Sequence, residues 1–412
     1  MMRWFLLLAA GLSATPKSAD WPQFRGPTDQ GIYADGPLPT EWSDTKNVVW
    51  KQAVPGKGWS SPITAGGRIY LTSAVPVEGG KAGELSLQAL CLDGETGSIR
   101  WAKEVFHEGP SDPKPHTKNS HASATPIVQG DRLYVHFGHM GTACLDLDGN
   151  IVWKSNEIHY VPVHGNGGSP VLVDGVLIFS CDGADQRCVV GLDAGDGHIV
   201  WKKERTEHPE KGFSFATPLV ITVGDRKEVV SQGSNVVAAY DPKNGEEIWR
   251  VRYNGYSVVP RPVFGNGLLY VCTGFDAPTL LAIRPDGKGD VTATHVAWTV
   301  TKNAPNSPSP LLLGDELYMV SDRGVITCLD AKTGEEIWHE NVHGGHSASP
   351  IAADGKIFFL NEDGVGVVIK AGRKFTLIGR NEIHEKTLAS YGVLEGSLLI
   401  RTETNLYRIQ AR

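Results

Sequence analysis

The sequence has no run of basic residues and little cysteine. Lys and Arg number 39 against 46 Asp and Glu, so the formal net charge is −7 at pH 7. This balance, with no basic cluster, argues against nucleic acid as a partner. The six cysteines in 412 residues include no adjacent pair. Four of them fall in predicted strands of different sheets, whereas Cys181 and Cys188 flank one hairpin loop and could form a disulfide.

Long apolar runs are also lacking, apart from one at the start of the chain. The run WFLLLAAGL follows the basic start MMR and is too short for a stable transmembrane anchor. It is typical of a secretory signal. We therefore expect a signal peptide over residues 1–19, with cleavage after Ala14 or Ala19, and a mature domain over residues 20–412 in the periplasm or outside the cell.

One short motif recurs along the whole chain. An apolar run reaches an Asp, then two or three turn residues and a Gly, then a second apolar run that ends in Trp. This order is typical of a β-hairpin, in which the Asp accepts from backbone amides and the Gly supplies a positive φ. We expect turn roles, not catalytic ones, for these aspartates. The clearest copies are CLDGETGSIRW at Cys91–Trp101, YDPKNGEEIW at Tyr240–Trp249 and CLDAKTGEEIW at Cys328–Trp338.

The ends of these hairpins give the number of repeats. Eight closing positions are separated by 37 to 52 residues, the length of a four-stranded propeller blade with its loops. They are Trp50, Trp101, Trp153, Trp201, Trp249, Trp298, Trp338 and Phe375.

A second series of residues falls between the closing positions and supports the same count. It places a Pro at the start of the first strand of seven blades, and Tyr391 in the eighth. Because Pro cannot donate to a ladder, a repeated Pro indicates that each first strand is a sheet edge, as it is beside the channel of a propeller. The last blade lacks a fourth strand, and Asn47–Lys51 is a lone strand that can supply it. The sequence therefore predicts an all-β fold, a single eight-bladed propeller of four-stranded blades.

The hairpins, the Ser-Pro first strands and the secretory start resemble the pyrroloquinoline-quinone-like propeller repeats. The stretches DWPQFRGP, KNSHASATP and RIYLTS are similar to a secreted branch of that family. The resemblance implies the fold, and it brings in pyrroloquinoline quinone and calcium as possible cofactors. The quinoprotein enzymes carry an adjacent Cys-Cys pair over the quinone, and this sequence departs from them because it has none.

The predicted blades have two unequal faces. The Asp-Gly turns lie on one, which we call the turn face. The connections between blades and between second and third strands lie on the other, the loop face. The long irregular pieces Ser73–Ser86 and His107–Ser123 fall on the loop face. Since binding residues concentrate on variable loops held by a rigid scaffold, the loop face is the candidate binding face.

Four residues near the predicted channel mouth are candidates for cofactor or ligand binding. Arg261 is the exception in a ring of small hydroxyl residues that precede the repeated Pro. It either pairs with an acid inside the protein or binds a carboxylate or phosphate. His121, His164 and His346 lie on the same connections. No residue is predicted to be catalytic and none to bind a metal.

Three functions remain open from the sequence. The first is a monomeric binding or scaffold module whose loop face takes a protein, a glycan or a small anionic ligand. The alternative is a quinoprotein oxidoreductase with a degenerate site. The third is a hydrolase or lyase that uses His and Arg in the channel mouth, although no triad spacing is visible. Whether the protein is an enzyme stays open.

Overall fold

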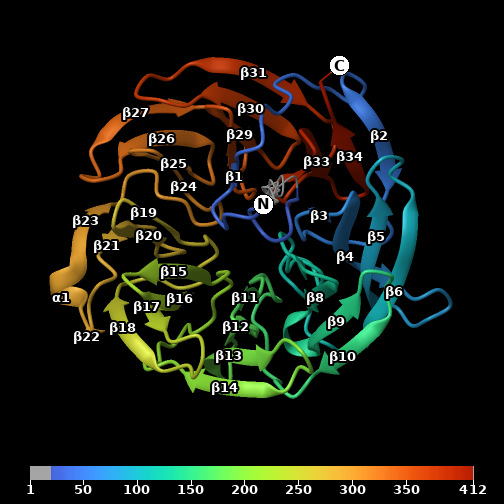
Figure 1. The fold of residues 1–412 in the computed structure, drawn as a ribbon, viewed down its shortest axis with the longest axis horizontal. Helices are drawn as coiled ribbons and strands as arrows, with labels where there is room; N and C mark the ends of the chain where they lie inside the picture. The colour runs from blue at the N-terminus through green and yellow to red at the C-terminus, as the bar shows by residue number, and fades with distance from the viewer. Residues whose placement is uncertain (1–19, 412) are drawn as a thin grey trace, which may run out of the picture.

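The computed structural model describes residues 20–411 and confirms the eight-bladed propeller. Eight sheets stand around a central channel, and the first strands of neighbouring blades contact one another (Figure 1). No helix within the described residues is long and apolar enough to cross a bilayer. The predicted signal peptide lies outside the described residues.

The strands follow in order from blade 1 to blade 4. Blade 1 comprises β3 (Ile63–Ala65), β4 (Arg68–Pro76), β5 (Leu85–Asp93) and β6 (Ile99–Glu108). Blade 2 comprises β7 (Ile127–Gln129), β8 (Arg132–His136), β9 (Thr142–Asp146) and β10 (Ile151–Ser155), with the short helix η1 (Gly138–Met140). Blade 3 comprises β11 (Val171–Val173), β12 (Val176–Asp182), β13 (Arg187–Asp193) and β14 (Ile199–Glu204). Blade 4 comprises β15 (Leu219–Val223), β16 (Arg226–Gly233), β17 (Val236–Tyr240), β18 (Glu247–Arg252) and the added β22 (Gly289–Asp290).

The same order continues through the second half of the ring. Blade 5 comprises β19 (Val263–Gly265), β20 (Leu268–Cys272), β21 (Leu280–Ile283) and β23 (Val296–Val300), with α1 (Thr292–His295) before its last strand. Blade 6 comprises β24 (Leu311–Leu313), β25 (Glu316–Val320), β26 (Val325–Asp330) and β27 (Glu336–Asn341). Blade 7 comprises β28 (Ile351–Ala353), β29 (Lys356–Leu360), β30 (Val365–Lys370), β31 (Leu377–Glu382) and the added β1 (Ile32–Tyr33). Blade 8 comprises β32 (Gly392–Leu394), β33 (Ser397–Arg401), β34 (Asn405–Ile409) and β2 (Val48–Ala53).

The N-terminal strand closes the ring as the sequence predicts. β2 pairs antiparallel with β34, so blade 8 is built from both ends of the described chain. This pairing covers the strand edge that the last three strands would otherwise expose.

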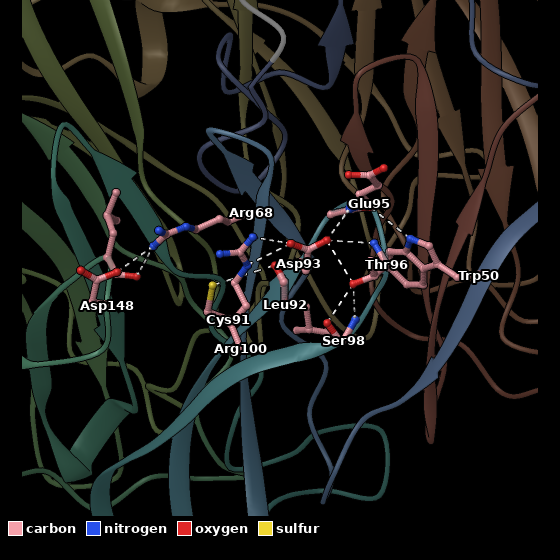
Figure 2. Close-up of polar contacts among 12 residues, drawn as sticks. Trp50, Arg68, Cys91, Leu92, Asp93, Glu95, Thr96, Ser98, Arg100 and Asp148 are labelled. Carbon is pink, nitrogen blue, oxygen red and sulfur yellow. Dashed lines mark hydrogen bonds and ion pairs between the residues drawn. The ribbon is translucent and has the colours of Figure 1, made fainter.

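The recurring Trp and the turn Gly join one blade to the next at five of the eight joints. Trp50 donates from Nε1 to the carbonyl of Gly94 at 3.0 Å (Figure 2). Gly97 of the same turn lies against the Trp50 ring. A Cβ on Gly97 would lie 2.6 Å from that ring, and the φ of Gly97 is +76°. Both the close contact and the backbone conformation therefore require Gly at this position. The same pairing occurs between Trp101 and Gly149, Trp153 and Gly197, Trp201 and Gly245, and Trp298 and Gly334.

The repeated Asp is a turn acceptor, as expected. Oδ1 of Asp93 accepts from the amides of Glu95 at 3.0 Å and Thr96 at 2.9 Å (Figure 2). The Thr96 amide and the guanidinium of Arg100 lower the pKa of Asp93 to about 2. The aspartates at 193, 241 and 330 accept from amides two residues on in the same way.

One closing position is corrected by the structure. Phe375 precedes β31 instead of lying in it, and its ring packs 5.4 Å from that of Trp338 in blade 6. Opposite Val368, where the other blades place their Trp, blade 7 has Gly379. The backbone of Thr40 covers Gly379, since its carbonyl oxygen would lie 2.6 Å from a Cβ there. The nearby Trp42 is buried over Gly366 of β30 and packs edge-on against Tyr391 of blade 8. The repeat pattern missed this because Trp42 lies more than 300 residues before blade 7 in the chain.

Residues 20–46, which we call the N-terminal segment, first cross the central channel. Trp21 forms two backbone hydrogen bonds with Thr64 of blade 1, and the carbonyl of Pro22 accepts from Val128 of blade 2. β1 then pairs in parallel with β28 of blade 7. Residues 21–33 of the segment, in blue, therefore lie near the centre of the ring in Figure 1.

Candidate functional site

The ring of small hydroxyl residues serves the fold. In six joints between blades, the hydroxyl accepts from the backbone amide of the equivalent residue one blade earlier, at 2.9 to 3.0 Å. These bonds run from Ser61 to Thr125, Thr125 to Ser169, Ser169 to Thr217, Arg261 to Ser309, Ser309 to Ser349, and Ser349 to Ser390. The hydroxyls thus satisfy buried backbone groups.

Arg261 is buried against the N-terminal segment. Its Nε donates to the carbonyl of Pro218 at 2.9 Å, and Nη1 donates to those of Phe24 and Asp29 at 3.0 and 3.2 Å. Nη2 lies 3.1 Å from the Asp29 carboxylate, an ion pair that is not aligned as a hydrogen bond. Burial lowers the pKa of Arg261 while Asp29 opposes the shift. Only 1% of the residue is exposed, so a ligand could reach Arg261 only by displacing the segment.

A second buried guanidinium lies in the channel beside Arg261. Arg25 of the N-terminal segment donates to the carbonyls of Pro310 and Gln30, each at 2.8 Å. Burial, then the positive charge of Arg261, lowers the pKa of Arg25 to about 9. Through backbone carbonyls, Arg261 joins the segment to blades 4 and 5, and Arg25 joins it to blade 6.

The three candidate histidines lie in different surroundings. His346 is buried, with Nδ1 3.1 Å from the carbonyl of Gly344 and Nε2 without a partner, and burial lowers its pKa. His164 is exposed, with a φ of +68°. His121 is partly exposed and pairs with Glu108. No hydrogen bond, ion pair or ring contact within residues 20–411 joins two of the four candidates, so their role in binding stays a prediction.

A cavity of about 420 Å³ opens on the loop face at His121. It is lined by the end of β6, by the connection between blades 1 and 2, and by the β4–β5 hairpin. Both carboxylate oxygens of Glu108 are buried there without a hydrogen-bond donor. Nδ1 of His121 approaches Oε2 to 2.6 Å but is not aligned as a donor. A buried acceptor without a donor is costly, so this carboxylate is prepared to accept one from a ligand or water.

Aromatic rings continue from this cavity around the channel mouth. Each ring centroid lies 5.3 to 6.0 Å from that of at least one neighbouring ring, mostly edge to face. The rings come from the connections between consecutive blades and from the β20–β21 turn of blade 5. We call them the aromatic strip: His116, His164, Phe213, Phe215, Tyr256 and Phe275. His116 also lines the cavity, so the cavity and the strip form one surface.

The long connection that carries His116 is held in place from two sides. The amide of His116 and Nδ2 of Asn119 both donate to the carbonyl of His164, at 3.0 and 2.9 Å. Nζ of Lys118 lies 2.7 Å from Oε1 of Glu362 in the β29–β30 turn of blade 7. The connection therefore spans part of the channel mouth on the loop face.

Sequence reasoning identified the connection that carries His116 but missed several residues of the cavity and the aromatic strip. Glu108 ends an outer strand, and nothing in its local pattern distinguishes it from an exposed strand residue. The rings of Phe213, Tyr256 and Phe275 lie far apart in the chain, and only the order of the blades brings them together. A sequence signal did exist, because an aromatic occurs in each of three successive loop-face connections.

The residues beside the channel do not fit pyrroloquinoline quinone and calcium. The quinone carries carboxylates and needs free cations, whereas Arg25 and Arg261 already donate to the chain's own carbonyls. Within residues 20–411 one set of three acid or His side chains could surround a metal ion. It comprises Asp193, Asp196 and His198, which lie on an Asp-Gly turn of the turn face.

The ring of eight four-stranded blades, joined to one another by hydrogen bonds and by the packing of Trp on Gly, defines a propeller of the pyrroloquinoline-quinone-like repeat class. A family model described as "Outer membrane protein assembly factor BamB" matches residues 32–157, 82–212, 158–277, 185–305 and 287–374. These overlapping matches cover most of the chain, which therefore belongs to this family.

Individual relatives fall in two groups. The outer membrane protein assembly factor BamB of Shewanella oneidensis is 26% identical over 234 residues, covering 53% of this chain and 54% of that protein. A polyvinylalcohol dehydrogenase of a Sphingopyxis species is 24% identical over 389 residues, covering 82% of this chain and 55% of that enzyme. The chain thus spans about half the length of both. The crystal structure of BamB from Moraxella catarrhalis superposes with a TM-score of 0.62 at 16% identity, covering 89% of this chain and 97% of that chain, which shows a shared fold.

Proposed function

We propose that this protein is a binding module of the periplasm or cell exterior that holds its partner on the loop face. The observation that carries the proposal is the single surface formed by the Glu108 cavity and the aromatic strip. It combines an unsatisfied buried acceptor with partly exposed rings, and both features are typical of ligand sites.

The rest of the channel region supports the same assignment. The hydroxyl ring, Arg25 and Arg261 are all engaged in holding blades or the N-terminal segment together. The turn face carries the repeated Asp-Gly turns, whose polar groups bond within the turn. A loop-face module is also consistent with relatives named as assembly factors.

A ligand screen by thermal shift tests this proposal. Ligands that raise the melting temperature of the wild type should lose their effect in His116→Ala/Phe275→Ala, a double variant of the loop face. They should keep it in Lys332→Ala, a control on an exposed turn of the opposite face. Stabilisation that depends on Lys332 instead would contradict the proposal.

The quinoprotein alternative is tested on the same samples. The protein is titrated with pyrroloquinoline quinone and Ca²⁺ while absorbance and dye-linked alcohol oxidation are followed. The proposal predicts neither saturable binding nor oxidation. Saturable binding together with oxidation would replace it with the oxidoreductase assignment.

A further inference from the structure

We infer that the loop face binds a neutral, hydroxyl-rich glycan chain, which lies along the aromatic strip with one end in the Glu108 cavity. This inference rests on the proposed function and adds the chemical class of the partner. It depends on two features, the aromatic strip and the buried carboxylate.

The aromatic strip provides a platform for flat apolar faces. Phe275 at the far end of the strip is 51% exposed. Among the large apolar residues of the described chain that are exposed to solvent, it is the only aromatic one. Val161 and Val259, 51% and 38% exposed, lie on the loop-face connections between blades 2 and 3 and between blades 4 and 5. The other exposed apolar side chains lie on outer strands, so the loop face holds a distinct apolar area. Sugar rings present apolar C–H faces that pack on such aromatic rings.

The cavity provides the complementary polar contact. Glu108 is 1% exposed, and neither of its carboxylate oxygens receives a hydrogen bond from the protein. A sugar hydroxyl is a donor, and it can accept from an imidazole such as that of His121 at the same time. One hydroxyl-rich end group could therefore satisfy Glu108 without bringing a charge into the cavity.

Other polymers fit this surface less well. A polyanion such as a nucleic acid would place negative charge beside Glu108 on a chain of net charge −7. An extended peptide gains affinity by adding a strand to an open sheet edge, and the strip consists of connections between blades. A neutral glycan needs neither a basic surface nor a strand edge.

Affinity gel electrophoresis of the full mature chain tests the inference. Soluble xylan, galactomannan, dextran and hydroxyethyl cellulose serve as neutral probes, and alginate serves as the anionic probe. At least one neutral polymer should retard the wild type, whereas alginate should not. Phe275→Ala removes one stacking contact, so it should raise the dissociation constant obtained from the retardation roughly three- to tenfold.

Two further variants make the test specific. Glu108→Gln keeps the shape of the side chain but removes the charge and one acceptor, and it should also weaken binding. Leu377→Ala removes an equally exposed apolar side chain from the outer strand β31 and should bind like the wild type. Melting curves confirm that each variant is folded.

Three outcomes would overturn the inference. They are no retardation by any neutral polymer, retardation by alginate alone, and retardation unchanged in both Phe275→Ala and Glu108→Gln. In the first two cases the loop-face module still stands if the thermal-shift screen finds another ligand that the loop-face double variant loses. If Leu377→Ala weakens binding as much as Phe275→Ala, the loop-face assignment itself falls.

Discussion

Replacing Arg261 by Ser tests whether the N-terminal segment is a structural part of the channel. The variant makes the position match the small hydroxyl residues of the other blades, but it removes three hydrogen bonds to the carbonyls of Pro218, Phe24 and Asp29. It also leaves the partly buried Asp29 carboxylate without its cation. Breaking a buried pair by removing one partner typically costs about 3–5 kcal/mol. Because Asp29 is partly exposed, we expect a loss near 3 kcal/mol in the free energy of unfolding.

The pH dependence of that loss provides a second measurement. Burial raises the pKa of Asp29 above 3.8, and Arg261 opposes the shift, so the variant should raise it further. A carboxyl with a raised folded pKa favours the folded state when it is protonated, and this contribution is lost as the pH rises through that pKa. The difference in stability between wild type and variant should therefore shrink as the pH falls toward 3.8. Urea unfolding at several pH values measures it.

A matched set of variants completes the experiment. Asp29→Asn in the Arg261→Ser background should recover part of the lost stability and remove the extra pH dependence. If Arg261→Ser stays within about 1 kcal/mol of the wild type, the guanidinium is dispensable for the fold. The account of a structural Arg261 would then be refuted, and its prediction as an anion site would gain weight.

Three further predictions follow from the joints between blades and from the cysteines. Deleting residues 47–51 removes most of β2 and exposes the edge of β34, so the protein should aggregate or melt far below the wild type by calorimetry. Gly197→Ala should lower the free energy of unfolding by about 2–4 kcal/mol, because its Cβ would lie 2.5 Å from a tryptophan ring. Gly175→Ala has nearly the same φ but nothing within 4 Å of its Cβ, so it should lower that free energy by about 1 kcal/mol. Equal losses in the two variants would show that the close packing is unimportant. Cys181 and Cys188 are buried thiols directly opposite each other on β12 and β13. Refolding in the presence of oxidised glutathione should therefore join them in a disulfide detectable by mass spectrometry, unlike the four isolated cysteines.

The sequence was sufficient for the parts of the fold that repeat. Each Trp, Gly and Asp of the hairpin motif has its role within about 50 residues of the chain, so the period reveals the blade and its junction with the next. Ring closure was also predictable, since a lone first strand and an incomplete last blade complete each other. The prediction of a closing position was wrong where the repeat itself is broken, at Phe375 in blade 7.

The contacts of the N-terminal segment could not be derived in the same way. Arg25, Asp29 and Trp42 occur once, outside any repeat, and their partners lie between 200 and 350 residues away. Arg261 differed visibly from the hydroxyls around it, but the sequence could not tell which group meets its charge. The candidate site was located only to a face, because Glu108 becomes notable only when its oxygens are seen to lack donors.

The joints between blades explain why the proposed binding site lies on the loop face and away from the axis. On the turn face, the closing Trp of one blade packs on the turn Gly of the next at five of the eight joints, so those turns cannot change sequence without loosening a joint. On the axis, the N-terminal segment and two buried arginines occupy the channel. The connections of the loop face carry neither constraint and can differ in length and side chains from blade to blade. The cavity and the aromatic strip lie where the ring permits variation, around the channel mouth between blades 1 and 5, so substitutions there should change binding while leaving the stability of the propeller nearly unchanged.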